Sequence, residues 1–387
     1  MVAAALQLFL LTGSSLQVGL LSLAQLPPLL IGSFVGGTLA DAFDRRRLLL
    51  GTQLALAACS AGLALNAALD APRIWPIFVC TAVAAALSGI DGPTRAASVG
   101  SLVARDQLAS AAALNQTIYQ VGFVVGPSLA GLVIGNVSLA AAYWLDVVTF
   151  GGAIACLARM SSLVPEGGGT KAGWRSIREG LSFLRRERAV QGCFVVDINA
   201  MVFGMPRALF PELGTRLYGG GAGTVGLLYA APGLGALIAA LTTGWVGRVA
   251  RPGRAVLVAV AAWGASIAAF GATTILPVGL VLLALAGAAD VVSAVFRNTI
   301  IQLQVPDRLR GRLNALNIAV VTGGPRLGDL EAGAVAAVTT PSVSVISGGV
   351  ACIAGVGVLA RLLPELAAWR APVGAESAAT GSVPEIT

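Results

Sequence analysis

Charged side chains inside apolar segments are the residues of this sequence most able to do chemistry, because a charge at membrane depth is costly and is often functional. The candidate substrate or proton groups of this kind are Asp146, Asp197, Asp290, Arg326 and Asp329. The chain has no histidine, so carboxylates would have to carry any proton chemistry. Protonation of a buried carboxylate would remove the charge that holds a cation or a basic side chain.

Arg326 and Asp329 are three residues apart, which places them on one helical face and close enough to pair. At 1.5 Å per residue, Arg326 lies roughly 20 Å from an expected helix start at Leu313, beyond the middle of a membrane. We expect the pair to take part in gating or coupling. Glu331 lies on another face, nearer the helix end, where an interfacial position would explain it.

The composition is that of a membrane protein. Hydrophobic residues make up 56% of the chain, charged residues 11%, and the mean hydropathy is +0.84, whereas charged residues are about a quarter of a soluble domain. The five cysteines each lie in an apolar run, so neither a disulfide framework nor a metal cluster is indicated. No cofactor or metal site is predicted.

Eleven segments approach the roughly 20 residues that a helix needs to cross a bilayer. They are residues 17–40, 48–68, 74–91, 110–135, 139–159, 190–213, 225–247, 255–274, 277–296, 313–338 and 341–362. The preceding VAAALQLFLL is too short to span the membrane. We expect it to be the second half of a helix whose first half is missing.

The basic residues predict the orientation. If the spans alternate in direction, one side holds the C-terminal tail and the loops at 41–47, 92–109, 160–189, 248–254 and 297–312. Counting Arg159 and Arg361 at helix ends, that side carries 21 of the 25 Lys and Arg residues, all except Arg73, Arg207, Arg216 and Arg326. The positive-inside rule makes it cytoplasmic. The net charge of +7 therefore reflects topology, and nucleic-acid binding is the weaker interpretation.

The loops also predict the domain organisation. We expect a first helix bundle at residues 1–160, a cytoplasmic linker at 161–189 and a second bundle at 190–362. The linker contains GWRSIREGLSFLRRERAV, whose apolar residues recur at helical spacing, so it is either an amphipathic helix on anionic lipid or a simple connection. Residues 363–387 are predicted to be a disordered cytoplasmic tail.

An internal repeat relates the two bundles. Eight residues recur with a constant offset of 202 positions: Arg95, Val103, Leu114, Asn115, Gly122, Gly126, Ala130 and Gly131 match Arg297, Val305, Leu316, Asn317, Gly324, Gly328, Ala332 and Gly333. A constant register across loop and helix indicates a duplication. An even number of spans separates the copies, so both run in the same direction, as in parallel transporter repeats.

With this duplication and its motifs, the chain resembles the major facilitator superfamily over nearly its whole length. The segment GGTLADAFDRRR resembles the superfamily's cytoplasmic signature at Gly37, Asp41, Arg45 and Arg46, although Asp44 replaces a usual glycine. Gly37 would allow close helix approach. By this resemblance, Asp41 would cap the helix beginning near Leu313.

A second motif resembles that of drug-exporting antiporters in the same superfamily. GFVVGPSLAG supplies Gly122, Gly126, Pro127 and Gly131, where the glycines would let helices approach and the proline would bend the helix. In the second copy, Pro127 is replaced by Asp329. VPDRLRGRLNALN and SIREGLSFLRR resemble the branch that includes the enterobactin exporter.

The resemblance implies a fold and a function. The fold would be all-α, with twelve membrane helices in two parallel six-helix repeats, the first helix being incomplete here. Helices one, four, seven and ten would line a central cavity, which favours Asp197 and Asp290 as its functional groups. The expected protein is a monomeric, proton-coupled exporter of amphipathic drugs or a siderophore in the cell membrane, with its long loops and C-terminus cytoplasmic.

Two other classes stay open at this point. One is a non-transporting membrane sensor built on the same fold. The other is a membrane-embedded lipid-modifying enzyme, which the sequence disfavours because it shows neither a DDxxD-like pair nor a nucleophile elbow.

Overall fold

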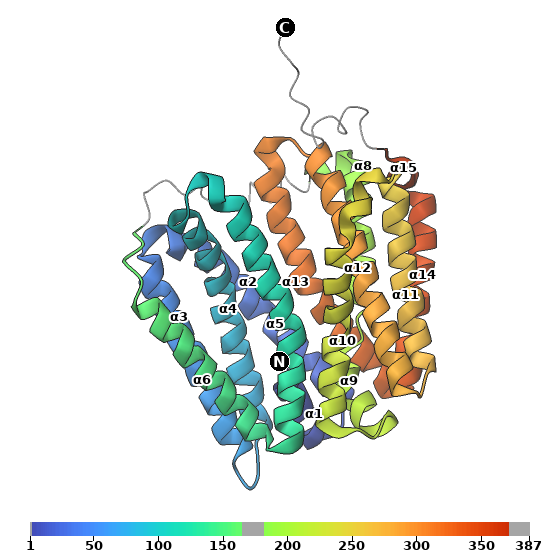
Figure 1. Cartoon of the computed structure of the whole chain (residues 1–387). Helices are drawn as coiled ribbons and strands as arrows, with labels where there is room; N and C mark the ends of the chain where they lie inside the picture. Colours follow the sequence, from blue (N-terminus) through green and yellow to red (C-terminus); the bar gives the residue numbers. More distant parts are fainter. Residues whose placement is uncertain (1, 165–181, 371–387) are drawn as a thin grey trace.

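The computed structural model describes residues 2–164 and 182–370 (Figure 1). Within these ranges the regular structure is helical, and no strand occurs, as the sequence predicts. Ten helices are long and apolar enough to cross a membrane. Of the predicted amphipathic linker helix, only residues 182–186 are described, and they are helical; the rest lies outside the described residues.

The first half of the chain contains six helices. They are α1 (Val2–Thr12), α2 (Ser15–Ala42), α3 (Arg45–Ala67), α4 (Ile74–Leu102), α5 (Leu108–Asn136) and α6 (Leu139–Ala158). In the second half, α8 (Arg188–Phe203), the short η2 (Arg207–Leu209), α9 (Phe210–Glu212) and the π-helical η3 (Leu213–Leu217) follow one another through one membrane span.

The remaining elements of the second half complete its bundle. They are α10 (Gly221–Leu241), η4 (Thr243–Arg248), α11 (Pro252–Ala272), α12 (Leu276–Gln304), α13 (Asp307–Val338), α14 (Pro341–Leu362) and α15 (Pro364–Ala368). Tertiary contacts join α2 to α4, α3 to α6, α10 to α12 and α11 to α14. Contacts between the halves run mainly from α2 to α13 and from α5 to α10.

Two predicted loops are largely helical. The α4 helix extends to Leu102 and α12 to Gln304, so residues 92–102 and 297–304 are helical and not loops. Apolar content marks only the part of a helix that lies in hydrocarbon, whereas the helix itself ends where its backbone pattern is interrupted. For α12 that interruption is Pro306, which disfavours helical geometry at the preceding residue.

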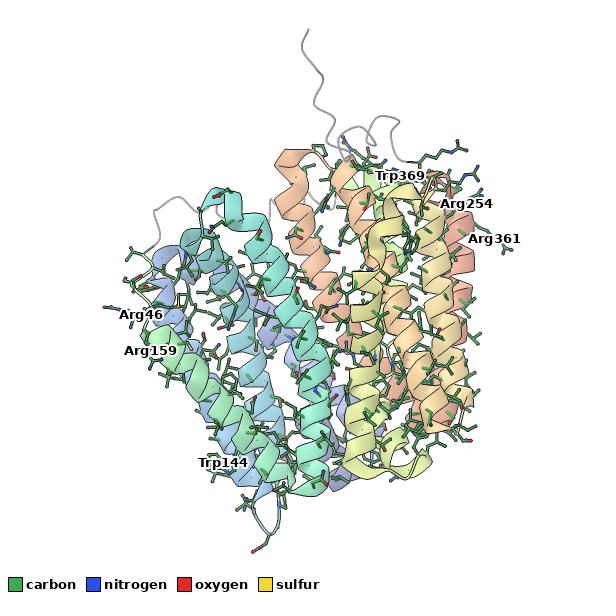
Figure 2. All side chains as sticks on the ribbon, in the orientation of Figure 1. Arg46, Trp144, Arg159, Arg254, Arg361 and Trp369 are labelled. Carbon is green, nitrogen blue, oxygen red and sulfur yellow. The ribbon has the colours of Figure 1, made fainter. Side chains whose placement is uncertain are left out.

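The basic loops gather at one end of the molecule, here called the basic end. Arg46, Arg159, Arg254 and Arg361 lie toward this end, away from Trp144 (Figure 2). The opposite end carries the turns after α1, α3, α5, η3, α11 and α13. The two ends therefore differ in charge as the sequence predicts.

The two halves meet near the opposite end (Figure 1). A Cβ placed on Gly19 of α2 would lie 2.5 Å from the carbonyl oxygen of Asp329 in α13, and one on Gly131 of α5 would lie 2.8 Å from Gly226 Cα in α10. Toward the basic end, in contrast, every residue of α5 from 112 to 119 is exposed. Among the described residues, the contacts between the halves therefore lie toward the opposite end, and α5 is not covered by the second half toward the basic end.

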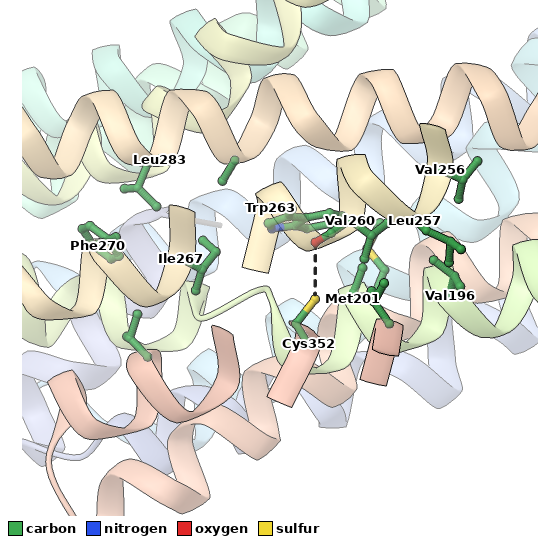
Figure 3. Packing of buried hydrophobic residues seen from close by; sticks show 14 of the residues in the cluster. Val196, Met201, Val256, Leu257, Val260, Trp263, Ile267, Phe270, Leu283 and Cys352 are labelled. Atoms are coloured by element: carbon green, nitrogen blue, oxygen red, sulfur yellow. Dashed lines mark hydrogen bonds between the residues drawn. The ribbon is translucent and has the colours of Figure 1, made fainter. Parts of the chain in front are cut away.

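The second half holds the larger apolar core. Leu257 and Trp263 of α11, Val196 and Met201 of α8 and Cys352 of α14 belong to one buried cluster, in which Val196 lies beside Leu257 (Figure 3). The Cys352 thiol donates a weak hydrogen bond to the carbonyl of Val260 at 3.8 Å. The five cysteines are all free thiols, consistent with a packing role for those that are buried.

The C-terminal segment departs from the prediction of a disordered tail starting at residue 363. Residues 364–368 form α15, in which Leu366 is 1% exposed and followed by the buried Trp369. Leu366 packs on two glycines, Gly192 of α8 and Gly253 of α11. Two large apolar side chains in an otherwise polar tail explain why this part folds back onto the bundle. Residues from 371 onward lie outside the described residues.

Close contact between α2 and α4 depends on Gly36 instead of the predicted Gly37. A Cβ on Gly36 would lie 2.6 Å from Ile90 Cα, while a Cβ on Gly37 would meet nothing within 4 Å. Successive residues point about 100° apart around a helix, so only one of the two adjacent glycines can face α4.

This difference gives opposite expectations for two neighbouring substitutions. Gly36→Ala should destabilise the protein by about 1–3 kcal/mol, because the methyl group collides with backbone. Gly37→Ala should be neutral or stabilise by up to about 1 kcal/mol, because alanine favours a helix and the space is open. Thermal unfolding of the two purified variants in one detergent tests this, and equal effects would contradict the assignment.

Candidate functional site

A break in the seventh membrane span positions the candidate site. After Gly204, Pro206 cannot donate a backbone hydrogen bond, and the chain restarts in η2 at Arg207. The indole of Trp263 donates to the carbonyl of Gly204 at 2.9 Å, and the Tyr229 hydroxyl donates to the carbonyl of Arg207 at 2.9 Å. Interrupted helices of this kind are tolerated in membranes where other groups satisfy the freed backbone.

Asp329 of α13 binds a backbone group freed by this break and also links the two halves. It is 8% exposed. Its Oδ1 accepts the backbone N–H of Ala208 at 2.9 Å, and its Oδ2 accepts the hydroxyl of Ser22 in α2 at 2.8 Å. Asp329 therefore caps the segment that follows Pro206 and binds a helix of the first half.

The predicted direct pair between Arg326 and Asp329 is wrong. Nη1 of Arg326 donates to the carbonyl of Thr322, one turn back on its own helix. The Asp329 oxygens are instead occupied by Ser22 and Ala208. Helical spacing places two residues on one face, but it does not determine whether their side chains bind each other or groups on other helices.

A buried ion pair connects α8 and α12. Nη2 of Arg297 lies 2.8 Å from Oδ1 of Asp197, with the two side chains 7% and 3% exposed. Nη1 of Arg297 donates to the hydroxyl of Ser293 at 3.0 Å. The partner of Asp197 is therefore Arg297, which we expected from the sequence to lie in a loop.

Asp290 lies on α12 two turns before Arg297. It is half-buried, and in the described part of the chain no hydrogen bond or ion pair fixes its carboxylate. The charges of Arg297, Asp197 and Arg207 all act on it. Asp290 is therefore the least constrained carboxylate near the middle of the membrane spans.

These residues form one group, here called the central polar cluster. Its members are Asp197, Arg207, Asp290, Arg297, Arg326 and Asp329. Electrostatic interactions connect Arg207 to Asp290, Asp329 and Arg326. The structure therefore brings together four of the five predicted substrate or proton groups.

Asp146, the fifth, lies elsewhere. It is an exposed residue of α6 whose Oδ2 accepts the hydroxyl of Ser60 in α3 at 2.6 Å. This contact ties two helices of the first half together. The geometry gives Asp146 a helix-bridging role, apart from the central polar cluster.

The arginines of the GGTLADAFDRRR motif bind helix C-termini. Arg45 donates to the carbonyls of Ala40 and Ala97 at 3.2 and 3.1 Å, near the ends of α2 and α4. Arg46 donates to the carbonyls of residues 157 and 158 at the end of α6, at 3.1 and 2.6 Å. Cations at these positions satisfy orphan carbonyls and complement the helix dipole.

Asp44, which departs from the motif, also has a defined role. Its Oδ1 accepts the backbone N–H of Arg46 and of Leu163, both at 3.0 Å, and its Oδ2 accepts the hydroxyl of Ser162 at 2.8 Å. Burial opposes the charge, but the hydrogen bonds from Ser162, Leu163 and Arg46 and the nearby Arg47 outweigh it and lower the pKa of Asp44. Asp44 therefore caps α3 and secures the segment after α6.

The predicted cap of α13 by Asp41 is not formed in this conformation, in the described part of the chain. The α13 helix begins at Asp307, so Leu313 lies inside the helix and its N–H is not an orphan donor. Asp41 itself is exposed. The sequence placed the helix start too late because the first turns of α13 are polar.

The antiporter-like motif on α5 contacts the second half through only part of its length. Gly122 and Gly126 meet nothing within 4 Å, whereas Gly131 lies against α10. The carbonyl of Pro127 would lie 2.7 Å from a Cβ on Gly226. In this conformation the predicted glycine face at 122 and 126 meets no other helix, although the adjacent Phe123 and Val124 of α5 do lie against Gly233 of α10.

The second copy of the motif is packed throughout. Gly324 and Gly328 both lie against Met201 of α8, and a Cβ on Gly333 would lie 2.7 Å from the carbonyl of Ser15 in α2. The two copies therefore make different contacts despite their shared register.

Several polar contacts were not anticipated from sequence. Arg297 was assigned to a loop, although its match to Arg95 in the repeat marks it as a residue of interest. Arg95 forms an ion pair with Asp91 at 2.9 Å, one turn away on α4. At the end where the halves meet, the Ser15 hydroxyl donates to Glu212 at 2.6 Å. No sequence periodicity relates that pair, because its members come from different halves.

Comparisons with known proteins agree on family and fold. A family model described as transmembrane secretion effector matches residues 1–378. The enterobactin exporter of Citrobacter koseri is 29% identical over 375 residues, covering 96% of this chain and 89% of that protein. The enterobactin exporter of Shigella boydii is 30% identical over 373 residues, covering 95% and 88%.

Solved transporter structures share the fold. The nucleoside transporter NupG superposes with a TM-score of 0.71 at 10% identity, covering 95% of this chain and 94% of that one. The human organic anion transporter MFSD10 gives 0.60 at 16% identity, covering 88% and 83%. These likenesses confirm the predicted major facilitator fold.

Substitutions at Asp329 should distinguish the stability that comes from its hydrogen bonds from the stability that comes from its charge. Asp329→Leu leaves the Ala208 N–H and the Ser22 hydroxyl without an acceptor, which should cost about 2–5 kcal/mol of unfolding free energy. Asp329→Asn keeps an acceptor oxygen and should cost clearly less. Arg326→Leu should also cost less than Asp329→Leu, because Arg326 bonds only within its own helix in the described part of the chain. Thermal unfolding measures all three, and a larger effect of Arg326→Leu would contradict the hydrogen-bond assignment.

Asp44 should contribute stability that depends on pH. Asp44→Ala removes an N-cap and should cost about 1 kcal/mol at pH 7. Because its folded pKa is lowered, this contribution is complete above the unfolded pKa and is lost as pH falls through the folded value. The Tm difference between parent and variant should therefore shrink below about pH 4. Asp41→Ala is the matched control and should change little; a difference that stays constant down to pH 3 would contradict the mechanism.

Proposed function

We propose that this chain, which belongs to the transmembrane secretion effector family within the major facilitator superfamily, is a proton-coupled exporter of amphipathic small molecules. It is a multi-pass membrane protein of a transporter family. The observation that carries the proposal is that the two halves are joined at one end and separate toward the other, and that Asp329 belongs both to the joined end and to the central polar cluster. Alternating access requires such an arrangement around a midplane site.

The direction of export follows from the orientation. The basic end is the cytoplasmic end by the positive-inside rule, so the closed contacts among Gly19, Asp329, Gly131 and Gly226 lie toward the outside. This conformation admits substrate from the cytoplasm. The relatives named as enterobactin exporters support a siderophore or a molecule of similar amphipathic character as the substrate.

Coupling to protons would use the carboxylates of the cluster. Protonation of Asp197 removes the charge that holds Arg297. Asp290 lacks a fixed partner in the described part of the chain and can exchange a proton without breaking an ion pair. We assign proton exchange to Asp290 and the control of Arg297 to Asp197. The unit of transport is a monomer, because one chain contains both halves and the whole cluster.

Transport into inside-out membrane vesicles tests this function. An acidic vesicle interior should drive uptake of enterobactin or of a drug-like amphipath, and collapse of the pH gradient should abolish the accumulation. Asp290→Asn should reduce gradient-driven uptake by about tenfold, equivalent to about 1.4 kcal/mol of coupling, while downhill exchange persists. Its control is Asp146→Asn, which alters an intramembrane carboxylate outside the cluster.

The outcomes separate coupling from transport. If uptake of every substrate tried is independent of the pH gradient, proton coupling is excluded. If Asp146→Asn loses gradient-driven uptake and Asp290→Asn does not, the assignment of Asp290 is overturned.

A further inference from the structure

Two arginines of the central polar cluster have unused hydrogen-bond donors. The Nε atoms of Arg207 and Arg326 are buried and have no partner in the described part of the chain. Nη1 of Arg326 donates to the carbonyl of Thr322. The side chain of Arg207 has no hydrogen bond or ion pair in the described part of the chain. Buried charged donors without acceptors are rare in folded proteins and call for an explanation.

The carboxylates of the cluster do not supply the missing acceptors. Asp329 directs its two oxygens to Ser22 and to the backbone of Ala208. Asp197 is paired with Arg297. Asp290 acts on Arg207 electrostatically, but no hydrogen bond joins them. Asp329 acts on both arginines electrostatically, but in the described part of the chain no hydrogen bond or ion pair joins a carboxylate to either arginine.

The two guanidinium groups also act on each other. Arg207 and Arg326 carry charges of the same sign and interact electrostatically. Two cations held together at the middle of a membrane repel each other in a medium of low dielectric. An anion between them would relieve that repulsion.

The backbone around Arg207 is fixed on both sides. The Tyr229 hydroxyl binds the carbonyl of Arg207 at 2.9 Å, and Asp329 binds the next N–H, that of Ala208, at 2.9 Å. Arg207 is thus held at the start of the segment after Pro206 while its own donors stay unused. A side chain on a rigid backbone with free donors is suited to binding a ligand.

We propose that Arg207 and Arg326 form an oxyanion-binding site, and that the transported amphipath carries a carboxylate or phenolate group. This rests on the proposed transport function and adds the charge of its substrate. The planar guanidinium groups match two oxygens of such a group and bind it more strongly than a neutral acceptor. A cationic amphipath would meet two like charges at the same place.

Binding of two probes that differ in charge tests the proposal. The full chain, purified in detergent without any ion gradient, is titrated with 1-pyrenebutyrate or 1-pyrenebutylamine, and energy transfer from the six tryptophans to pyrene reports binding. The butyrate should bind more tightly than the amine. Arg207→Gln and Arg326→Gln should each weaken butyrate binding by about 10- to 100-fold, with no loss of amine binding.

Two further variants control for charge and folding. Arg361→Gln removes an arginine at the basic end and should leave butyrate binding unchanged. Arg207→Lys keeps the charge but not the planar fork, and should give an intermediate affinity. If Arg207→Gln does not fold, Arg326→Gln and Arg207→Lys carry the same test.

The proposal is overturned if the amine binds as tightly as the butyrate, or if both arginine variants bind the butyrate like the parent. Because binding is measured without a gradient, this result is independent of whether transport is coupled to protons. A protein that binds the anion but does not transport would contradict the proposed function and leave the anion site standing.

Discussion

The hydrogen-bond demand of the broken helix at Pro206 is the constraint around which the second half is arranged. Hydrocarbon cannot satisfy free backbone groups, so the break requires partners from three other helices. Trp263 of α11, Tyr229 of α10 and Asp329 of α13 provide them. The break brings these helices together, and at the same level the Arg207 side chain has no hydrogen bond or ion pair in the described part of the chain.

Asp329 connects this constraint to the relation between the halves. One oxygen serves the break and the other binds Ser22 of the first half. Movement of α2 away from α13 would therefore disturb both the closed contact and the broken helix. A single carboxylate thus links the contact between the halves to the central polar cluster by direct hydrogen bonds.

The duplicated halves differ in where they place charge. In the first half, the ion pair between Asp91 and Arg95 lies within one helix. In the second half, the matching Arg297 reaches across to Asp197 on another helix. The buried charges of the central polar cluster thus lie in the second half, while the arginines near the end of α2 hold the first half together through helix C-termini.

The sequence by itself determined the class of protein, the positions of the spans, the repeat and the residues worth examining, because apolar length, charge asymmetry and constant register are properties of local sequence. It also selected four members of the central polar cluster, since a charge within an apolar span stands out without a structure. Tertiary structure alone decided the partners. Arg326 donates to a carbonyl of its own helix, and Arg297 lies in a helix and pairs with Asp197. Gly36, and not Gly37, lies at the contact between α2 and α4. These outcomes depend on the rotation of each helix about its axis and on which neighbouring group lies within hydrogen-bond distance of a side chain. Spacing along one chain encodes neither.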